Sequence, residues 1–113
     1  MALFTSIFKA SIKKDSNYNL LSVDNYKEAI SKKTVQLVDV RTPGEFRAGH
    51  ISGAVNIDFF DRANFRSRFE KFDKEKPLYI YCRSGNRSQK AANIIKDLGF
   101  KEIYDLAGGI MRW

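Results

Sequence analysis

The sequence predicts an α/β fold with three α/β/α layers around a mainly parallel five-stranded sheet. Short apolar segments rich in β-branched and aromatic residues alternate with longer amphipathic segments, and strands that alternate with helices usually pair in parallel between two helix layers. Segment 35–40 is mostly apolar, as expected for a strand buried on both faces. A chain of 113 residues suffices for one domain with a single core and is too short for two.

The first half of the chain is expected to contain three strands and two helices. Asp24 is the predicted N-cap of the first helix, because its side chain can accept an N–H bond from the first turn. Pro43 is predicted to open the second helix, because proline is tolerated in a first turn. The predicted strands are 19–23, 35–40 and 54–57, and the predicted helices are 25–32 and 43–48.

The second half is expected to contain the other two strands. Phe65, Phe69 and Phe72 recur at helical spacing with basic residues between them, which predicts a helix that covers the sheet. Gly99 is expected to end the longest helix, because glycine readily takes the left-handed conformation found at helix C-termini. The predicted strands are 77–81 and 101–105, the longest helix is 88–98, and a last helix begins within 109–113.

We expect the folded domain to comprise residues 19–113, preceded by an N-terminal arm at 1–18. The first ten residues are mildly apolar, but they lack the basic segment and the longer apolar stretch of a secretory signal. A frayed arm or a short docking segment is expected instead. No stretch approaches the roughly 20 consecutive apolar residues of a membrane span.

The formal net charge of +7 raises the question of nucleic-acid binding. The basic residues are interleaved with acidic and apolar ones, as on solvated helix faces, and no RNA-binding aromatic signature or Gly-rich phosphate loop accompanies them. No group of residues has the spacing of metal ligands either. We therefore expect no nucleic-acid partner, no metal and no cofactor, and we expect the basic surface to attract small anions.

Cys82 is the only cysteine, and it lies between the predicted fourth strand and the longest helix. A lone cysteine is usually a small buried apolar residue. However, a loop that enters a helix directs several N–H groups at one point, which together with the helix dipole and two arginines favours a thiolate and an adjacent anion. A nucleophilic thiol in an anion-binding loop is therefore predicted, and a free thiol suits the reducing cytoplasm. The loop residues are Arg83, Ser84, Gly85, Asn86, Arg87 and Ser88.

Three motifs in order resemble the signatures of the rhodanese superfamily, over roughly residues 20–113. The first is Asp-Val-Arg at 39–41 with Gly-His-Ile-Ser-Gly-Ala at 49–54, the second is Cys-Arg-Ser-Gly-Asn-Arg-Ser at 82–88, and the third is Leu-Ala-Gly-Gly-Ile-Met-Arg-Trp at 106–113. The resemblance implies a single-domain sulfurtransferase. Its Cys82 would carry sulfur as a persulfide from thiosulfate to cyanide or a thiol, with a protein as a further possible acceptor.

The length of the loop separates activities within this superfamily. Four residues lie between Cys82 and Arg87. Protein tyrosine phosphatases and rhodanese-like phosphatases place five there, because a phosphate needs a wider ring of N–H donors than one sulfur atom. The resemblance therefore favours a thiosulfate sulfurtransferase. A persulfide carrier with little turnover of small molecules is the alternative, and a phosphatase or arsenate reductase is less favoured.

The loop arginines are expected to have different roles in sulfur transfer. Arg83 is expected to point outward and bind the sulfonate oxygens of the donor, whereas Arg87 is expected to turn inward and brace the loop. Gly85 is expected to take a positive φ, because the loop must curl around one atom.

Four further residues are predicted to support the site. Asp39 either holds the loop by accepting N–H bonds or caps the helix that follows, and both interpretations stay open. Arg41 and Glu45 are expected to form an ion pair that fixes the second turn, with Arg87 as a further partner. His50 is expected to make a structural hydrogen bond in its Gly-His-Ile turn, because a thiolate stabilised by its loop needs no general base.

Overall fold

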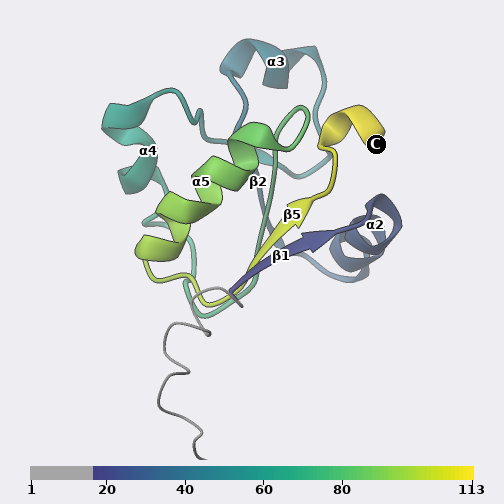
Figure 1. The fold of residues 1–113 in the computed structure, drawn as a ribbon, viewed down its shortest axis with the longest axis horizontal. Helices are drawn as coiled ribbons and strands as arrows, with labels where there is room; N and C mark the ends of the chain where they lie inside the picture. The colour runs from purple at the N-terminus through teal and green to yellow at the C-terminus, as the bar shows by residue number, and fades with distance from the viewer. Residues whose placement is uncertain (1–16) are drawn as a thin grey trace, which may run out of the picture.

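The computed structural model describes residues 17–113, in which five strands form a single sheet in the order β1-β5-β4-β2-β3. Every strand pairing is parallel, which confirms the predicted α/β fold (Figure 1). Most of the predicted arm at 1–18 lies outside the described residues, and Tyr18 is the first residue of β1. The strands are β1 (Tyr18–Leu21), β2 (Gln36–Asp39), β3 (Val55–Asn56), β4 (Leu78–Tyr81) and β5 (Ile103–Leu106).

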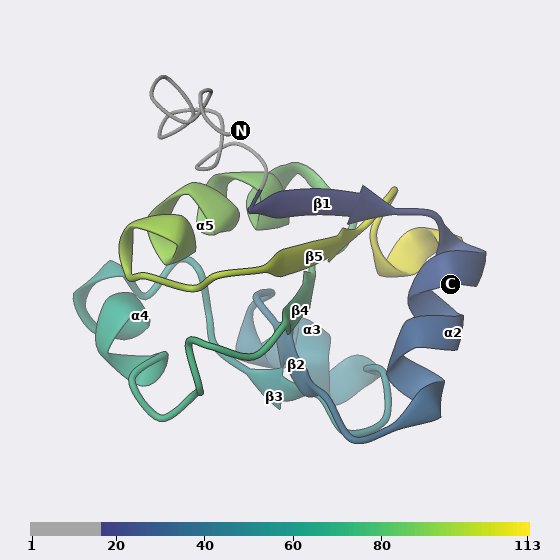
Figure 2. The same ribbon diagram turned by 90° about the horizontal axis from the view of Figure 1, so that it is seen from below.

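Helices cover both faces of the sheet. Figure 2 shows α4 and α5 on one side and α2 on the other. In Figure 1, α3 and η1 lie at the same end of the sheet as the loop between β4 and α5. None of the helices within 17–113 is long and apolar enough to cross a membrane. The helices are α2 (Val23–Lys32), α3 (Pro43–Ala48), α4 (Arg62–Arg68), α5 (Asn86–Asp97) and the 3-10 helix η1 (Ile110–Arg112).

Alternate residues of the central strands fill two separate cores. Val38 and Ile80 pack with residues of α4 and α5, whereas Leu37 and Tyr79 pack with Tyr26 of α2. Because successive strand side chains point to opposite faces, a central strand between two helix layers must be apolar on both. This burial on both faces agrees with the expectation for segment 35–40.

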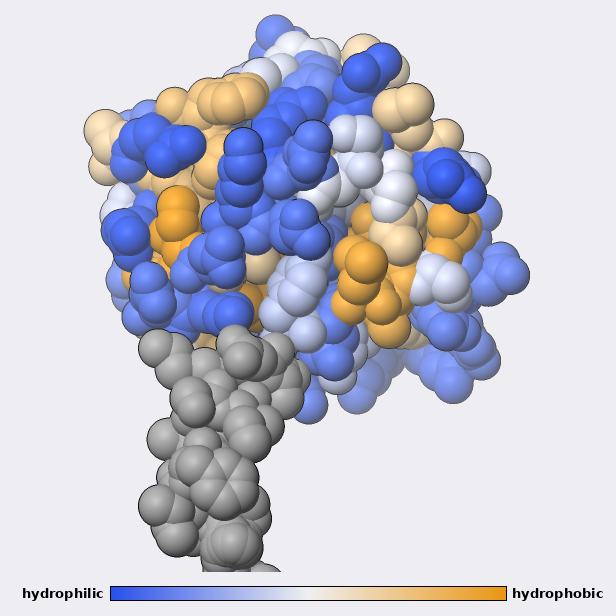
Figure 3. All heavy atoms as spheres, viewed as in Figure 1, coloured by the Kyte–Doolittle hydropathy of each residue, from blue (hydrophilic) through white to orange (hydrophobic). Residues whose placement is uncertain are grey.

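The outer surface over α5 differs in polarity from the surface over β1 (Figure 3). The face shown in Figure 3 is mainly hydrophilic over α5, and an apolar patch lies over β1. Leu20 of β1, an edge strand of the sheet, is 55% exposed.

The N-cap predicted for the first helix is wrong. Ser22, not Asp24, caps α2, and its side chain accepts the N–H of Asn25 at 3.2 Å. Asp24 lies in the first turn, where a carboxylate still interacts favourably with the helix dipole. The cap lies earlier than predicted because the helix begins at Val23, directly after β1.

Helix α4 is shorter than the spacing of the phenylalanines predicts. It ends at Arg68, so the prediction of one helix through Phe72 is wrong. The N–H of Phe69 bonds to the carbonyl of Arg66 and that of Phe72 bonds to the carbonyl of Phe69, both at 3.1 Å. Each of these two hydrogen bonds closes a tight turn between residues three apart in the chain. Phe65 and Phe69 are buried as expected.

The later elements differ from prediction mainly at their ends. Gly99 takes a φ of 104°, one residue after the C-cap Leu98, in agreement with its predicted left-handed conformation. Pro43 opens α3 as predicted, although Thr42 is the N-cap. The last element is the single 3-10 turn η1.

Candidate active site

The predicted site lies at the carboxyl ends of the sheet. Cys82 follows the last residue of β4, and Asp39 is the last residue of the neighbouring β2. Parallel strands end at the same edge, where ligands of open α/β sheets usually bind. The fold therefore brings the Cys82 loop and the turn after β2 to one edge.

The loop turns back toward the Cys82 thiol. The N–H of Gly85 donates to Cys82 Sγ at 3.0 Å. Cys82 itself is almost completely buried. Gly85 is the N-cap of α5, and its φ of 108° agrees with the predicted positive φ. A backbone donor and the positive end of a 12-residue helix thus both lie beside the sulfur atom.

A buried polar chain lies on the α5 side of Cys82. Ser88 Oγ lies 3.4 Å from Cys82 Sγ and donates to Asp105 Oδ2 at 3.0 Å. The Tyr18 hydroxyl donates to the same Oδ2 at 2.5 Å. Burial raises the pKa of the Asp105 carboxyl from 3.8 to about 6, although the hydrogen bonds from Tyr18 and Ser88 act in the opposite direction.

Tyr18 and Asp105 lie outside the motifs that predict the site, although both belong to this buried chain. The available signal was an acidic side chain within the otherwise apolar and aromatic segment of β5, Ile-Tyr-Asp-Leu. Asp105 lies on the same face of its strand as Ile103, which packs with α5. Tyr18 lies far from Asp105 in sequence, and only the pairing of β1 with β5 brings the two side chains together.

Arg87 joins the start of α5 to α3. Its guanidinium donates two hydrogen bonds to the Glu45 carboxylate, at 2.7 and 2.9 Å. The Arg87 hydrogen bond is the main cause that lowers the pKa of Glu45 from 4.5 to about 2. Arg87 also lies over the Phe60 ring, 5.4 Å from its centroid. These contacts agree with a loop-bracing position for Arg87.

The predicted ion pair between Arg41 and Glu45 is wrong. Arg41 instead bonds to Asp39, with its Nη2 2.6 Å from Oδ2, and donates to the carbonyl of Gly49 at 2.7 Å. The backbone N–H of Arg41 also donates to Asp39 Oδ1 at 2.8 Å. The tight turn after β2 brings this guanidinium back onto the buried carboxylate two residues earlier.

Asp39 therefore organises the turn after β2. It does not cap α3, whose N-cap is Thr42 in a capping box with Glu45, and its bonds to Arg41 lie outside the Cys82 loop. Neither of the two interpretations made from the sequence describes these contacts. The hydrogen bonds to the Glu45 carboxylate come instead from Thr42, in the capping box, and from Arg87.

His50 and Arg83 are both exposed. His50 Nδ1 lies 2.8 Å from the Phe46 carbonyl oxygen, and the two rings stack at 3.7 Å, in agreement with the predicted structural bond. The Arg83 side chain makes no hydrogen bond or ion pair with any residue between 17 and 113. It is therefore available to a ligand at the mouth of the loop, beside the exposed Ser84 and Asn86.

The segment after β5 supports the loop from outside. Ile110 N–H donates to the Cys82 carbonyl at 2.9 Å, and Met111 N–H donates to the Arg83 carbonyl at 3.1 Å. Gly109 has a φ of 70°, and a Cβ there would lie 2.3 Å from the carbonyl oxygen of Arg83. Glycine at 109 therefore permits a close approach of this segment to the loop.

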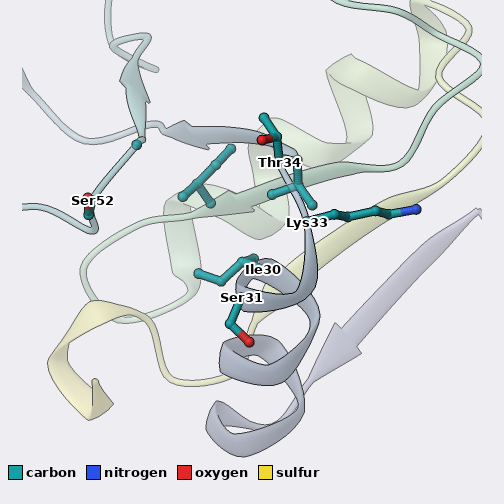
Figure 4. Close-up of a pocket in the computed structure, with 8 residues that line it drawn as sticks. Ile30, Ser31, Lys33, Thr34 and Ser52 are labelled. Atoms are coloured by element: carbon teal, nitrogen blue, oxygen red, sulfur yellow. The ribbon is translucent and has the colours of Figure 1, made fainter.

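A cavity of about 460 Å³ lies at the other end of the sheet (Figure 4). Ile30, Thr34 and Ser52 are among its lining residues. Because Thr34 precedes β2, this cavity is at the amino ends of the parallel strands, away from Cys82. It contains none of the predicted site residues, and no cluster of metal-binding side chains occurs within 17–113.

Known proteins resemble this chain in sequence. A thiosulfate sulfurtransferase, GlpE, of Shewanella oneidensis is 36% identical over 98 residues, which cover 87% of this chain and 94% of that protein. The uncharacterized protein YqhL of Bacillus subtilis is 41% identical over 81 residues, or 72% of this chain. The chain spans only 62% of the length of YqhL.

The fold and the family model agree with these relatives. A rhodanese-like domain protein of Staphylococcus aureus superposes with a TM-score of 0.74 at 29% identity, covering 84% of this chain and 90% of that one. The model of the rhodanese-like domain matches residues 22–113, which include the Cys82 loop, the turn after β2 and the segment after β5. The chain therefore belongs to the rhodanese superfamily.

Proposed function

We propose that this protein is a sulfurtransferase that moves a sulfane sulfur from thiosulfate, or a related donor, to cyanide or a thiol through a persulfide on Cys82. The observation that carries the proposal is the Cys82 sulfur bonded by the Gly85 N–H at the N-terminus of α5. The thiosulfate sulfurtransferase relative supports the choice of donor.

The reaction proceeds in two displacements. The Cys82 thiolate attacks the outer sulfur of thiosulfate, the sulfur–sulfur bond of the donor breaks, and sulfite leaves with the electron pair. Cyanide or an acceptor thiolate then attacks the terminal sulfur of the persulfide. Thiocyanate or a new persulfide leaves, and the Cys82 thiolate is regenerated.

Each form of Cys82 in this cycle carries negative charge. The Gly85 N–H and the α5 dipole can stabilise the thiolate and the persulfide without reorganisation, the kind of preorganised electrostatics that contributes strongly to catalysis. Arg87 is already paired with Glu45, so the exposed Arg83 is assigned to the sulfonate oxygens of the donor. Arg87 keeps the start of α5 in place.

Thiocyanate release from thiosulfate and cyanide tests the proposal. The wild-type protein should release thiocyanate repeatedly, and Cys82→Ser should release none. Arg66→Ala, which removes an exposed positive charge on α4, is the control and should keep full turnover. Undiminished turnover in Cys82→Ser would reject the proposal, whereas one persulfide per chain without turnover would favour a carrier.

A further inference from the structure

The proposed sulfur transfer makes no use of the most deeply buried carboxylate on the α5 side of the sheet. Asp105 is completely buried, and its Oδ1 has no hydrogen-bond partner within the described residues. A buried carboxylate without full pairing is costly. Asp105 lies two hydrogen bonds away from the reactive sulfur, through Ser88.

The contacts form a chain from the thiol to the carboxylate. The Cys82 S–H donates to Ser88 Oγ. The Ser88 hydroxyl has two acceptors within reach, Asp105 Oδ2 at 3.0 Å and the Gly85 carbonyl oxygen at 3.3 Å, and the shorter bond to the ionised carboxylate is the stronger one. While Ser88 donates to an ionised Asp105, it cannot donate to the sulfur. The protonation of the carboxylate and that of the thiol are therefore linked through one hydroxyl group.

We propose that Asp105 is a positioning residue that takes the Cys82 proton through Ser88 and so prepares the thiolate. The thiol proton moves to Ser88 Oγ as the hydroxyl proton of Ser88 moves to Asp105 Oδ2. The chain then holds a neutral carboxylic acid, a Ser88 hydroxyl that donates to sulfur, and a Cys82 thiolate. No proton leaves the chain. The inference rests on the proposed function, because it concerns the same thiol.

The surroundings of Asp105 suit a group that changes charge near neutral pH. Tyr18 faces it from β1 and Tyr26 lies near it from α2, and burial raises the pKa of both hydroxyls, so both stay neutral. Cys82 and Ser88 face it from the end of β4 and from α5. No basic side chain within 17–113 pairs with it. Burial places the Asp105 pKa at about 6, where the carboxyl can both accept and return a proton.

The linked titration has a measurable signature in thiol alkylation. Two coupled groups lose their protons in two macroscopic steps. Between these steps the fraction of thiolate paired with the neutral acid is constant. The rate of Cys82 alkylation by iodoacetamide should therefore reach a plateau as the pH is lowered, and should fall again only when Asp105 is protonated, below about pH 6.

Three variants test whether the effect of Asp105 on the Cys82 thiol depends on the hydrogen bonds through Ser88 or only on the charge of the carboxylate. Asp105→Asn preserves the shape of the side chain but cannot hold the proton, and Ser88→Ala breaks the chain while Asp105 stays. Both should show one inflection, with a rate that falls about tenfold per pH unit below it. Tyr18→Phe removes a bond to the charged carboxylate and should move the lower inflection to higher pH. Asp97→Asn, an exposed carboxylate on α5, should retain the wild-type profile.

The wild-type profile alone can overturn the inference, even if a variant fails to fold. A single inflection in the wild type, or a plateau that persists in Ser88→Ala, would contradict the linkage of Cys82 and Asp105 through Ser88. Alkylation needs no sulfur donor, so the result is independent of turnover. A plateau without thiocyanate release would reject the proposed function only, and turnover without a plateau would reject the role of Asp105 only.

Discussion

Arg83 and Arg87 belong to one loop but have different surroundings. Arg83 is exposed, whereas Arg87 is held by Glu45 and lies over the Phe60 ring. Arg83→Ala should raise the KM for thiosulfate on the order of tenfold with little loss of stability, because a charge-assisted bond to the donor is lost. Arg87→Ala should lower both kcat and the free energy of unfolding, by about 1 kcal/mol for the latter.

Steady-state kinetics and urea unfolding of both variants test this division of roles. Arg66→Ala again serves as the control for the loss of one positive charge. Equal kinetic effects of the two substitutions, with no difference in stability, would contradict it.

The stability of the fold is predicted to depend on pH through Glu45. Its pKa is lowered from 4.5 to about 2, chiefly by Arg87, so its charged form is favoured in the folded state. This stabilisation is complete above pH 4.5 and is lost as the pH falls through about 2. Glu45→Gln can keep the capping box but loses the ion pair, and should cost about 0.5–1 kcal/mol at neutral pH.

The pH dependence of urea unfolding checks this prediction. The difference in stability between the wild type and Glu45→Gln should shrink steadily below pH 4.5. A difference that stays constant down to pH 3 would show that the ion pair is not its cause.

At the scale of elements, the segment after β5 is predicted to hold the Cys82 loop in place. Gly109→Ala would place a Cβ 2.3 Å from the Arg83 carbonyl oxygen at a positive φ. It should cost more than about 1 kcal/mol in unfolding free energy and reduce turnover. Gly44→Ala is the matched control, because a Cβ there meets nothing within 4 Å.

Thermal unfolding and thiocyanate release of the two glycine variants decide this point. Gly44→Ala should preserve stability and turnover. If Gly109→Ala behaves in the same way, the segment does not brace the loop.

The sequence predicted the elements better than their ends. Alternation of apolar and amphipathic segments is a local signal, and it located all five strands of the sheet. The end of α4 and the cap of α2 depend on where the chain must turn to meet its neighbours. Phe72 keeps its aromatic contact with Phe69 at 5.9 Å although the helix has already ended, so spacing alone could not locate that end.

In the candidate site, the sequence predicted the Cys82 loop better than the contacts that other elements make with it. Cys82 and its loop are contiguous in sequence, so a motif identified them. The pairing of Glu45 with Arg87 and the contact of Ser88 with Asp105 join different elements. Only the packed sheet shows that Arg41 turns back to Asp39 and leaves Glu45 free for Arg87.

At the scale of the whole molecule, the short loop is predicted to set the chemistry of the site. Four residues between Cys82 and Arg87, with Gly85 curled onto the sulfur, leave a ring suited to one sulfur atom. Aryl phosphate hydrolysis should be negligible beside sulfur transfer, and insertion of one glycine after Gly85 should lower sulfur transfer. Aryl phosphatase activity that is substantial in the wild type and absent in Cys82→Ser would contradict this assignment.

The central claim is that Cys82 carries the transferred sulfur, and intact-mass analysis after incubation with thiosulfate tests it most directly. The wild-type protein should gain the mass of one sulfur atom and lose it again when cyanide is added. Cys82→Ser should remain unchanged throughout. An equal gain in mass by Cys82→Ser, or no gain by a folded wild-type protein, would contradict the account.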